Sequence, residues 1–233
     1  MSSDPILDQS AGNAARLQNG GDQPLERAGT LCDLCRYTEA QTVLSEVIAG
    51  EPRNVEAWSL MAKVQLGQEQ PRAALHAARA AISIAPTHDW PVRLASAALG
   101  GLGRHEEAAE AAATAVRLAP DDWRAQAQLA EALTPIRPRL DEAGAAASRA
   151  LELAPREARP HIAAGLVAEA DGRGGDAAKA FVRALALDPQ NGAAHANLER
   201  VRGGKGTRGR GGKGKRGRFL PRLSLRLGQR ASR

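Results

Sequence analysis

The sequence predicts an all-α protein built as a right-handed superhelical solenoid of about five helix-turn-helix repeats, with a capping helix and a disordered basic C-terminal tail. Two observations support this prediction. Aromatic residues make up only 3% of the 233 residues while hydrophobic residues reach 43%, and alanine supplies much of that share, whereas sheets favour β-branched and aromatic residues. In addition, prolines recur at spacings of 34, 34, 35 and 34 residues: Pro52, Pro86, Pro120, Pro155 and Pro189. Such a fixed period indicates stacked repeats.

Small or apolar residues occupy three fixed positions upstream of each proline. Twelve residues before it stand Ala40, Ala74, Ala108, Ala143 and Ala177. Eight residues before it stand Leu44, Ala78, Ala112, Ala147 and Phe181, and five residues before it stand Val47, Ala81, Ala115, Ala150 and Ala184. Steps of four and three residues place all three positions on one helix face, which predicts a second helix in each unit that packs closely against its neighbours.

The ends of these helices carry their own signals. Acidic residues stand near the start of the second helix, where the positive end of the helix dipole stabilises negative charge. They are Glu39, Glu107, Glu142 and Asp176. Each repeat proline ends a helix, and the polar residues that follow can cap the next one, namely Asn54, Asp121 and Asn191. Glycines mark the turn inside a unit at Gly67, Gly103 and Gly172.

These signals divide the chain into three parts. Residues 1–20 are expected to be a disordered N-terminal segment, residues 21–202 the solenoid, and residues 203–233 a basic tail rich in glycine, arginine and lysine. Within the solenoid the expected units are 21–54, 55–88, 89–122, 123–157 and 158–191, followed by a capping helix at 192–202. The fourth unit has one extra residue and contains Pro135 and Pro138, which predicts an altered hairpin turn there.

The repeat pattern resembles the tetratricopeptide repeat family over about residues 22–202. The second unit matches best, with Trp58, Ala62, Ala74, Ala81 and Pro86, and the fifth unit keeps Gly165, Ala177, Phe181, Ala184 and Pro189. The first unit departs from the pattern, because Pro24 stands where a large aromatic residue is expected. The resemblance implies helical hairpins that stack around a concave surface, and this surface generally holds peptide segments of other proteins.

If the first helix of each unit lines that surface, helical spacing selects the candidate binding residues Glu56, Ser59, Lys63, Trp90, Arg93, Arg124, Glu131, Arg159 and Ile162. Three arginines near one tryptophan would suit an acidic or carboxylate-ended peptide. The alternative is that these are ordinary solvated surface charges. The carboxylate clamp of chaperone-binding family members is absent, because the matching positions hold Ser59, Lys63, Trp90 and Leu94.

No arrangement of catalytic residues has an interpretable spacing, so we expect no enzyme activity, no metal, no cofactor and no small-molecule substrate. Cys32 and Cys35 form a CxxC motif, but a zinc site requires four ligands and no second pair exists. We therefore interpret both cysteines as packing residues. His161 and His195 share the repeat position of Trp58, which favours core packing over metal binding.

The charge is unevenly distributed along the chain. The net charge is +6, yet residues 205–233 contain 11 basic and no acidic residues, which leaves 21 basic against 26 acidic residues in the remainder. The glycine-rich matches to phosphate-binding motifs in this tail lack the strand and helix that such motifs need. The tail could contact RNA, DNA or an anionic membrane surface weakly through Lys205, Arg208, Arg210, Lys213, Lys215, Arg216 and Arg218, or it could simply be a solvated chain end.

The primary hypothesis is a non-enzymatic scaffold that holds partner proteins or peptides on the concave face. The alternative is a nucleic-acid-associated adaptor that uses the cationic tail. With two cysteines, no secretory signal and no long apolar run, the chain is expected to be cytoplasmic. The excess of arginine over lysine, 27 to 5, together with the alanine content, suggests a GC-rich, bacterial coding source.

Overall fold

The computed structural model describes residues 24–207, and this part of the chain is helical throughout, without strands. Its elements are α2 (Pro24–Asp33), α3 (Tyr37–Gly50), α4 (Val55–Gly67), α5 (Pro71–Ile84), α6 (Asp89–Gly101), α7 (His105–Leu118), α8 (Trp123–Leu133), the 3-10 turn η2 (Arg137–Arg139), α9 (Leu140–Leu153), α10 (Ala158–Ala170), α11 (Gly174–Leu187) and α12 (Gly192–Thr207).

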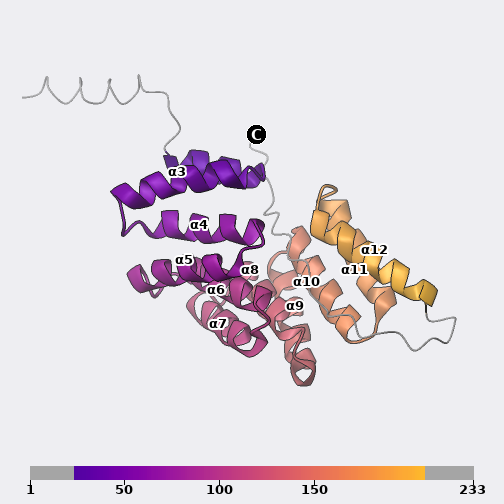
Figure 1. Cartoon of the computed structure of the whole chain (residues 1–233). Helices are drawn as coiled ribbons and strands as arrows, with labels where there is room; N and C mark the ends of the chain where they lie inside the picture. The colour runs from indigo at the N-terminus through magenta and orange to yellow at the C-terminus, as the bar shows by residue number, and fades with distance from the viewer. Residues whose placement is uncertain (1–23, 208–233) are drawn as a thin grey trace, which may run out of the picture.

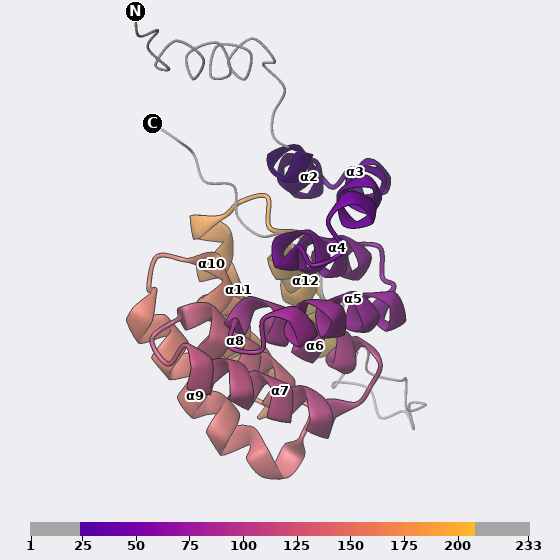
Figure 2. The ribbon, with the colours of Figure 1, turned by 90° about the vertical axis from the view of Figure 1, so that its left-hand side faces the viewer.

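The helices form five successive hairpins, α2–α3 to α10–α11, and α12 packs on the last of them (Figure 1). The first helices of neighbouring hairpins also contact one another, in the series α2, α4, α6, α8, α10 and α12. These first helices therefore form a continuous inner layer, against which the second helices pack (Figure 2). The predicted all-α solenoid is confirmed.

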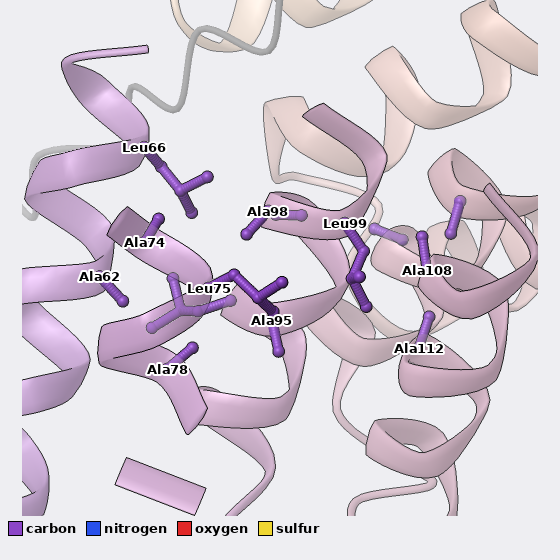
Figure 3. Packing of buried hydrophobic residues seen from close by; sticks show 14 of the residues in the cluster. Ala62, Leu66, Ala74, Leu75, Ala78, Ala95, Ala98, Leu99, Ala108 and Ala112 are labelled. Carbon is purple, nitrogen blue, oxygen red and sulfur yellow. The ribbon is translucent and has the colours of Figure 1, made fainter. Parts of the chain in front are cut away.

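Small side chains let the helices approach closely. The five alanines twelve residues before the repeat prolines are at most 1% exposed, and the positions eight residues before are buried in every unit. Figure 3 shows Ala74 and Ala78 of α5 and Ala108 and Ala112 of α7 in this packed layer. The core is thus built from repeated close contacts of methyl groups, as the sequence pattern predicts.

In the described part of the chain, one aromatic side chain is fully buried, and it needs a matching space on the facing helix. Phe181 of α11 is fully buried, and a Cβ added at Gly165 of α10 would lie 2.5 Å from its ring. The equivalent positions in the other units hold smaller side chains on the second helix and slightly larger ones on the first, for example Ala28 with Leu44. Glycine is therefore required at position 165 because phenylalanine stands at position 181.

The second helix begins with the same ion pair in four of the five units. The residue preceding the helix is an arginine, and it pairs with the acid three residues later: Arg36–Glu39, Arg104–Glu107, Arg139–Glu142 and Arg173–Asp176. Hydrogen bonding from these arginines lowers the pKa of Glu39, Glu107 and Glu142. The predicted acids are thus placed at the helix starts, each with a partner that the sequence analysis did not assign.

Two of the three predicted caps are confirmed. The side chain of Asn54 accepts from the amide of Ala57, and that of Asn191 accepts from the amide of Ala194. The prediction for Asp121 was wrong, because Asp122 immediately precedes α8 and accepts from the amide of Arg124. Asp121 instead pairs with Arg149 on the surface.

The turns inside the units differ in which residue adopts the left-handed backbone. Gly103 and Gly172 have φ angles of 74° and 80°, as expected for glycine in a tight turn. In the second unit Gly67 is the last residue of α4, and Glu69 adopts the left-handed conformation instead. The extra residue of the fourth unit is accommodated between α8 and α9, where α8 stops at Leu133 and η2 precedes α9.

The expected start of the solenoid at residue 21 lies outside the described residues, in which α2 starts at Pro24. α12 runs to Thr207, past residue 202, where the capping helix was expected to end. α12 buries Ala194, Leu198 and Val201 against α10 and α11 and exposes Glu199 and other polar residues, as a capping helix should. The remainder of the predicted tail, and the predicted N-terminal segment, lie outside the described residues.

The fit between Gly165 and Phe181 predicts that the effect of Gly165→Ala on the free energy of unfolding changes sign with the residue at position 181. Gly165→Ala should destabilise the native chain by about 1–3 kcal/mol, because the added methyl group overlaps the ring. In a Phe181→Leu background, which gives the Ala28–Leu44 combination of the first unit, the same change should stabilise by up to about 1 kcal/mol, because alanine is the better helix former. Urea denaturation followed by helical circular dichroism gives both values.

Gly144→Ala in α9 is the matched control, since an added Cβ there would meet nothing closer than 4.0 Å. It should stabilise both backgrounds. A destabilising effect of Gly165→Ala in both backgrounds would contradict the size-matching explanation.

The ion pairs at the helix starts predict a defined pH dependence. A carboxylate with a lowered pKa contributes stability above its unfolded pKa, about 4.3 for glutamate, and loses it as the pH falls through the lower folded value. The melting temperature of the native chain should therefore exceed that of the variant Glu39→Gln/Glu107→Gln/Glu142→Gln at pH 7, and the difference should vanish towards pH 2. A difference that persists in strong acid would show that the pairs do not cause it.

Candidate functional site

The first helices of the third, fourth and fifth units enclose a cavity of about 380 Å³, here named the Trp90 hollow. Its lining residues come from α6, the residue preceding it, α8 and α10: His88, Asp89, Trp90, Arg93, Leu94, Ala97, Arg124, Gln128 and Arg159. Four of the predicted groove residues, Trp90, Arg93, Arg124 and Arg159, are thus brought together. The inner layer of the solenoid places them there because all four belong to first helices.

Arg93 is held by two carboxylates of the same chain. Its Nε donates to Oδ2 of Asp89 at 2.7 Å, and its Nη2 lies 3.5 Å from Oδ2 of Asp122. Burial lowers the pKa of Arg93, because its side chain is only 12% exposed, while Asp89 favours the charged form. The guanidinium is thus partly desolvated and already neutralised by its neighbours.

Arg159 is the centre of a hydrogen-bonded network that crosses three first helices. It donates to both carboxylate oxygens of Glu131 at 3.0 Å and to Oε1 of Gln128 at 2.7 Å. Gln128 in turn donates to Ser96, whose hydroxyl donates to the carbonyl of Ala108 at 2.8 Å. Burial acts to lower the pKa of Arg159, but the charge and hydrogen bonds of Glu131 outweigh it and raise the pKa.

Arg124 differs from the other two arginines. Its guanidinium lies 4.5 Å from the ring centroid of Trp123 and 3.5 Å from Asp122, and its side chain is 43% exposed. Within the described residues its guanidinium makes no hydrogen bond, although it is ion-paired with Asp122, and Arg124 lines the hollow. Of the three arginines, Arg124 is therefore the one that can donate to a ligand without breaking an internal hydrogen bond.

Two predicted groove residues are buried and do not line the hollow, so these two predictions of a lining position were wrong. Ser59 is fully buried and donates to the carbonyl of Val55, and Ile162 packs in the core with α11 and α12. Ser59, Arg93 and Ile162 occupy the same repeat position, and this position faces the neighbouring first helix. From this position only a long side chain, such as that of Arg93, reaches the hollow. Helical spacing alone does not reveal this rotation.

The remaining predicted groove residues lie elsewhere on the first helices. Glu56 is exposed in the first turn of α4, and Lys63 bonds to Asp33 of α2 at 2.9 Å. Glu131 holds Arg159 rather than lining the hollow. Sequence reasoning missed Gln128, although one signal was available: the equivalent positions in the other units hold Leu60, Leu94 and Ala163, so a polar residue interrupts an apolar register.

The cysteines and histidines have structural partners. Cys32 is buried beneath α4, and burial raises the pKa of its thiol, while Sγ of Cys35 accepts from the hydroxyl of Tyr37. His161 and His195 contact the carbonyl oxygens of Pro155 and Pro189, as the indole of Trp58 does with Pro52. Core packing was the wrong interpretation for His195, which is exposed. These rings instead close the turn between units.

Within residues 24–207 no group of three or more histidine, cysteine, aspartate or glutamate residues could hold a metal ion. The same residues include no helix long and apolar enough to cross a membrane. Of the predicted tail contacts, Lys205 belongs to α12. Arg208, Arg210, Lys213, Lys215, Arg216 and Arg218 lie outside the described part of the chain.

The buried network predicts an asymmetry between breaking the Arg159–Glu131 pair and replacing it. Glu131→Gln should destabilise by about 3 kcal/mol, because it removes the only carboxylate to which Arg159 is hydrogen bonded in the described residues and leaves only the weaker charge interaction with Asp122. The double variant Glu131→Leu/Arg159→Met should cost much less, because no charge remains. Urea denaturation compares the two, and equal losses would contradict a role for uncompensated charge.

Comparisons with known proteins support the repeat architecture. Residues 93–158, from α6 to the start of α10, match the family model described as tetratricopeptide repeat. No curated protein sequence matches the chain.

Solved structures with similar folds include TTC0263, a tetratricopeptide repeat protein of Thermus thermophilus, at 21% identity and a TM-score of 0.68, which covers 76% of this chain and 96% of that one. The human IFIT1 dimer with m7Gppp-AAAA is 19% identical with a TM-score of 0.69, covering 86% of this chain and 52% of that one. YrrB, a tetratricopeptide repeat protein with an unusual peptide-binding site, is 18% identical with a TM-score of 0.50, covering 81% and 98%. At these identities the likeness concerns the fold: residues 93–158 match the tetratricopeptide repeat family, and the described hairpins have the architecture of solved tetratricopeptide repeat proteins.

Proposed function

We propose that the chain is a non-enzymatic scaffold that holds a peptide segment of a partner protein in the Trp90 hollow. The observation that carries this proposal is the combination on adjacent first helices of an open cavity, an indole and one guanidinium without an internal hydrogen bond. A cavity of about 380 Å³ is within the range of ligand pockets. The tetratricopeptide fold supports an interaction role in general, and the hollow supplies the place.

The charges of the hollow indicate which type of peptide it would bind. Arg93 and Arg159 already have aspartate or glutamate partners, so a strongly acidic peptide would have to compete with internal ion pairs. Leu94 and Ala97 are buried beside the half-buried Trp90 and provide an apolar wall. The ligand is therefore a peptide with one bulky apolar side chain for this wall and a single carboxylate for Arg124.

A phage-displayed library of random peptides tests this function. Peptides enriched on the native chain should contain an apolar residue near an aspartate, a glutamate or the free C-terminus, and Trp90→Ala should weaken their binding at least tenfold. Arg124→Gln should weaken the carboxylate-bearing peptides and leave amidated or glutamine-substituted versions of them nearly unchanged.

Arg149→Gln is the matched control, because Arg149 is an exposed arginine of the outer helix α9 and pairs only with surface acids. It should leave peptide binding unchanged, and circular dichroism should show the same helicity in all variants. Failure to enrich any peptide, or equal binding to the native chain and Trp90→Ala, would refute the proposed site.

A further inference from the structure

A second cavity of about 480 Å³ lies at the N-terminal end of the solenoid, here named the N-terminal hollow. α2, α3 and the residues that lead into α4 form it. Its lining residues are Pro24, Leu25, Val43, Glu46, Val47, Gly50, Glu51 and Asn54. None of them lines the Trp90 hollow, so the two cavities are separate.

The N-terminal hollow lies where the end of α3 is less covered than the ends of the later second helices. The described part of α2 starts at Pro24, which holds the repeat position of Trp58. In the later units the position five residues before the proline is a fully buried alanine, but its counterpart Val47 is only partly buried. The end of α3 thus keeps a partly exposed apolar surface at a position that is fully buried in the later units.

The described lining of this hollow is acidic. It includes Glu46 and Glu51, and none of its described residues is basic. Both glutamates are exposed, and neither forms an ion pair with any residue in the described part of the chain, although Glu51 accepts from Asn54 at 2.8 Å. Apolar walls with two carboxylates at an exposed rim fit a ligand that is both apolar and basic.

The chain itself contains a segment of that kind. Residues 219–227, with the sequence FLPRLSLRL, alternate leucine with basic or polar residues. In an extended peptide Leu223, Leu225 and Leu227 would point to one side and Arg222 and Arg226 to the other. The leucines could then contact the apolar walls while the two arginines reach the two glutamates of the rim.

α2 and α12 are the first and the last helix of the described stack. The N-terminal hollow lies beside α2 and α3, and the segment follows α12 in the chain (Figure 1). Each copy thus has the hollow at one end of the stack and the segment beyond the other end, which is the arrangement that a head-to-tail contact between copies uses.

We propose that residues 219–227 of one copy of the chain bind in the N-terminal hollow of a second copy, which joins the copies head to tail. Such a contact uses two different surfaces of each molecule, so it leaves one hollow and one tail free in every dimer and allows further addition unless a ring closes. The proposal does not depend on what the Trp90 hollow binds.

Sedimentation equilibrium of the nuclease-treated full chain tests this contact over a wide range of concentrations. The native chain should show an average mass that rises with concentration. Glu46→Gln/Glu51→Gln and, separately, Arg222→Gln/Arg226→Gln should each weaken the association at least tenfold. A synthetic peptide of residues 219–227 should dissociate the assemblies, and the same peptide with both arginines replaced by glutamate should not.

A charge exchange makes the test specific. Glu46→Arg/Glu51→Arg and Arg222→Glu/Arg226→Glu should each fail to self-associate, and an equimolar mixture of the two should form mixed assemblies whose average mass again rises with concentration. Glu106→Gln/Glu110→Gln is the matched control, because it removes two exposed acids of α7 far from the hollow in sequence and should leave association unchanged.

Three results would overturn the proposal. One is a chain that stays monomeric at every concentration. Another is association that needs nucleic acid and disappears after nuclease treatment, which would assign the tail to nucleic acid instead. The third is a concentration-independent contact within one molecule, detected by crosslinking of residue 46 to the tail in the monomer fraction.

Discussion

The close approach of helices through alanine is the constraint on which the rest of this structure depends. Positions twelve and eight residues before the repeat prolines pack with almost no exposed surface in every unit, and most of them are alanines. Each contact buries little area, so the stability is a sum over many similar interfaces between neighbouring units. A phenylalanine fits at this position only where the facing helix has glycine in place of alanine, as Gly165 does opposite Phe181.

The same stacking determines where chemistry can appear. Because first helices contact first helices, a residue at a given repeat position is placed beside its counterparts in the next units. Glu56, Trp90, Arg124 and Arg159 occupy one such position, and only the last three meet in a hollow. The backbone therefore places one equivalent position on each first helix in a row. In the third to fifth units the side chains at this position line the Trp90 hollow.

The sequence predicts the fold far better than the site. Proline spacing and the small-residue registers define the hairpins and the buried alanines, because those features depend only on helical periodicity and volume. The burial of Ser59 depends on how each first helix is rotated against the next, which a single helix pattern does not contain. The partners of Arg93 and Arg159 depend on where long side chains end, so residues in different units can pair without any local signal. The extension of α12 through Gly203 likewise runs against the low helix propensity of glycine.

The polar groups of the two hollows have opposite surroundings. In the Trp90 hollow the buried arginines are neutralised within the chain, so an apolar ligand group can enter without leaving an unpaired charge in a desolvated site. In the N-terminal hollow the carboxylates stand at an exposed rim and stay hydrated, so they need no internal partner. Exposed charges that pair across an interface are screened by salt, whereas apolar contacts are not. Association through the N-terminal hollow should therefore weaken as ionic strength rises, while binding in the Trp90 hollow should depend on salt only through the single contact at Arg124.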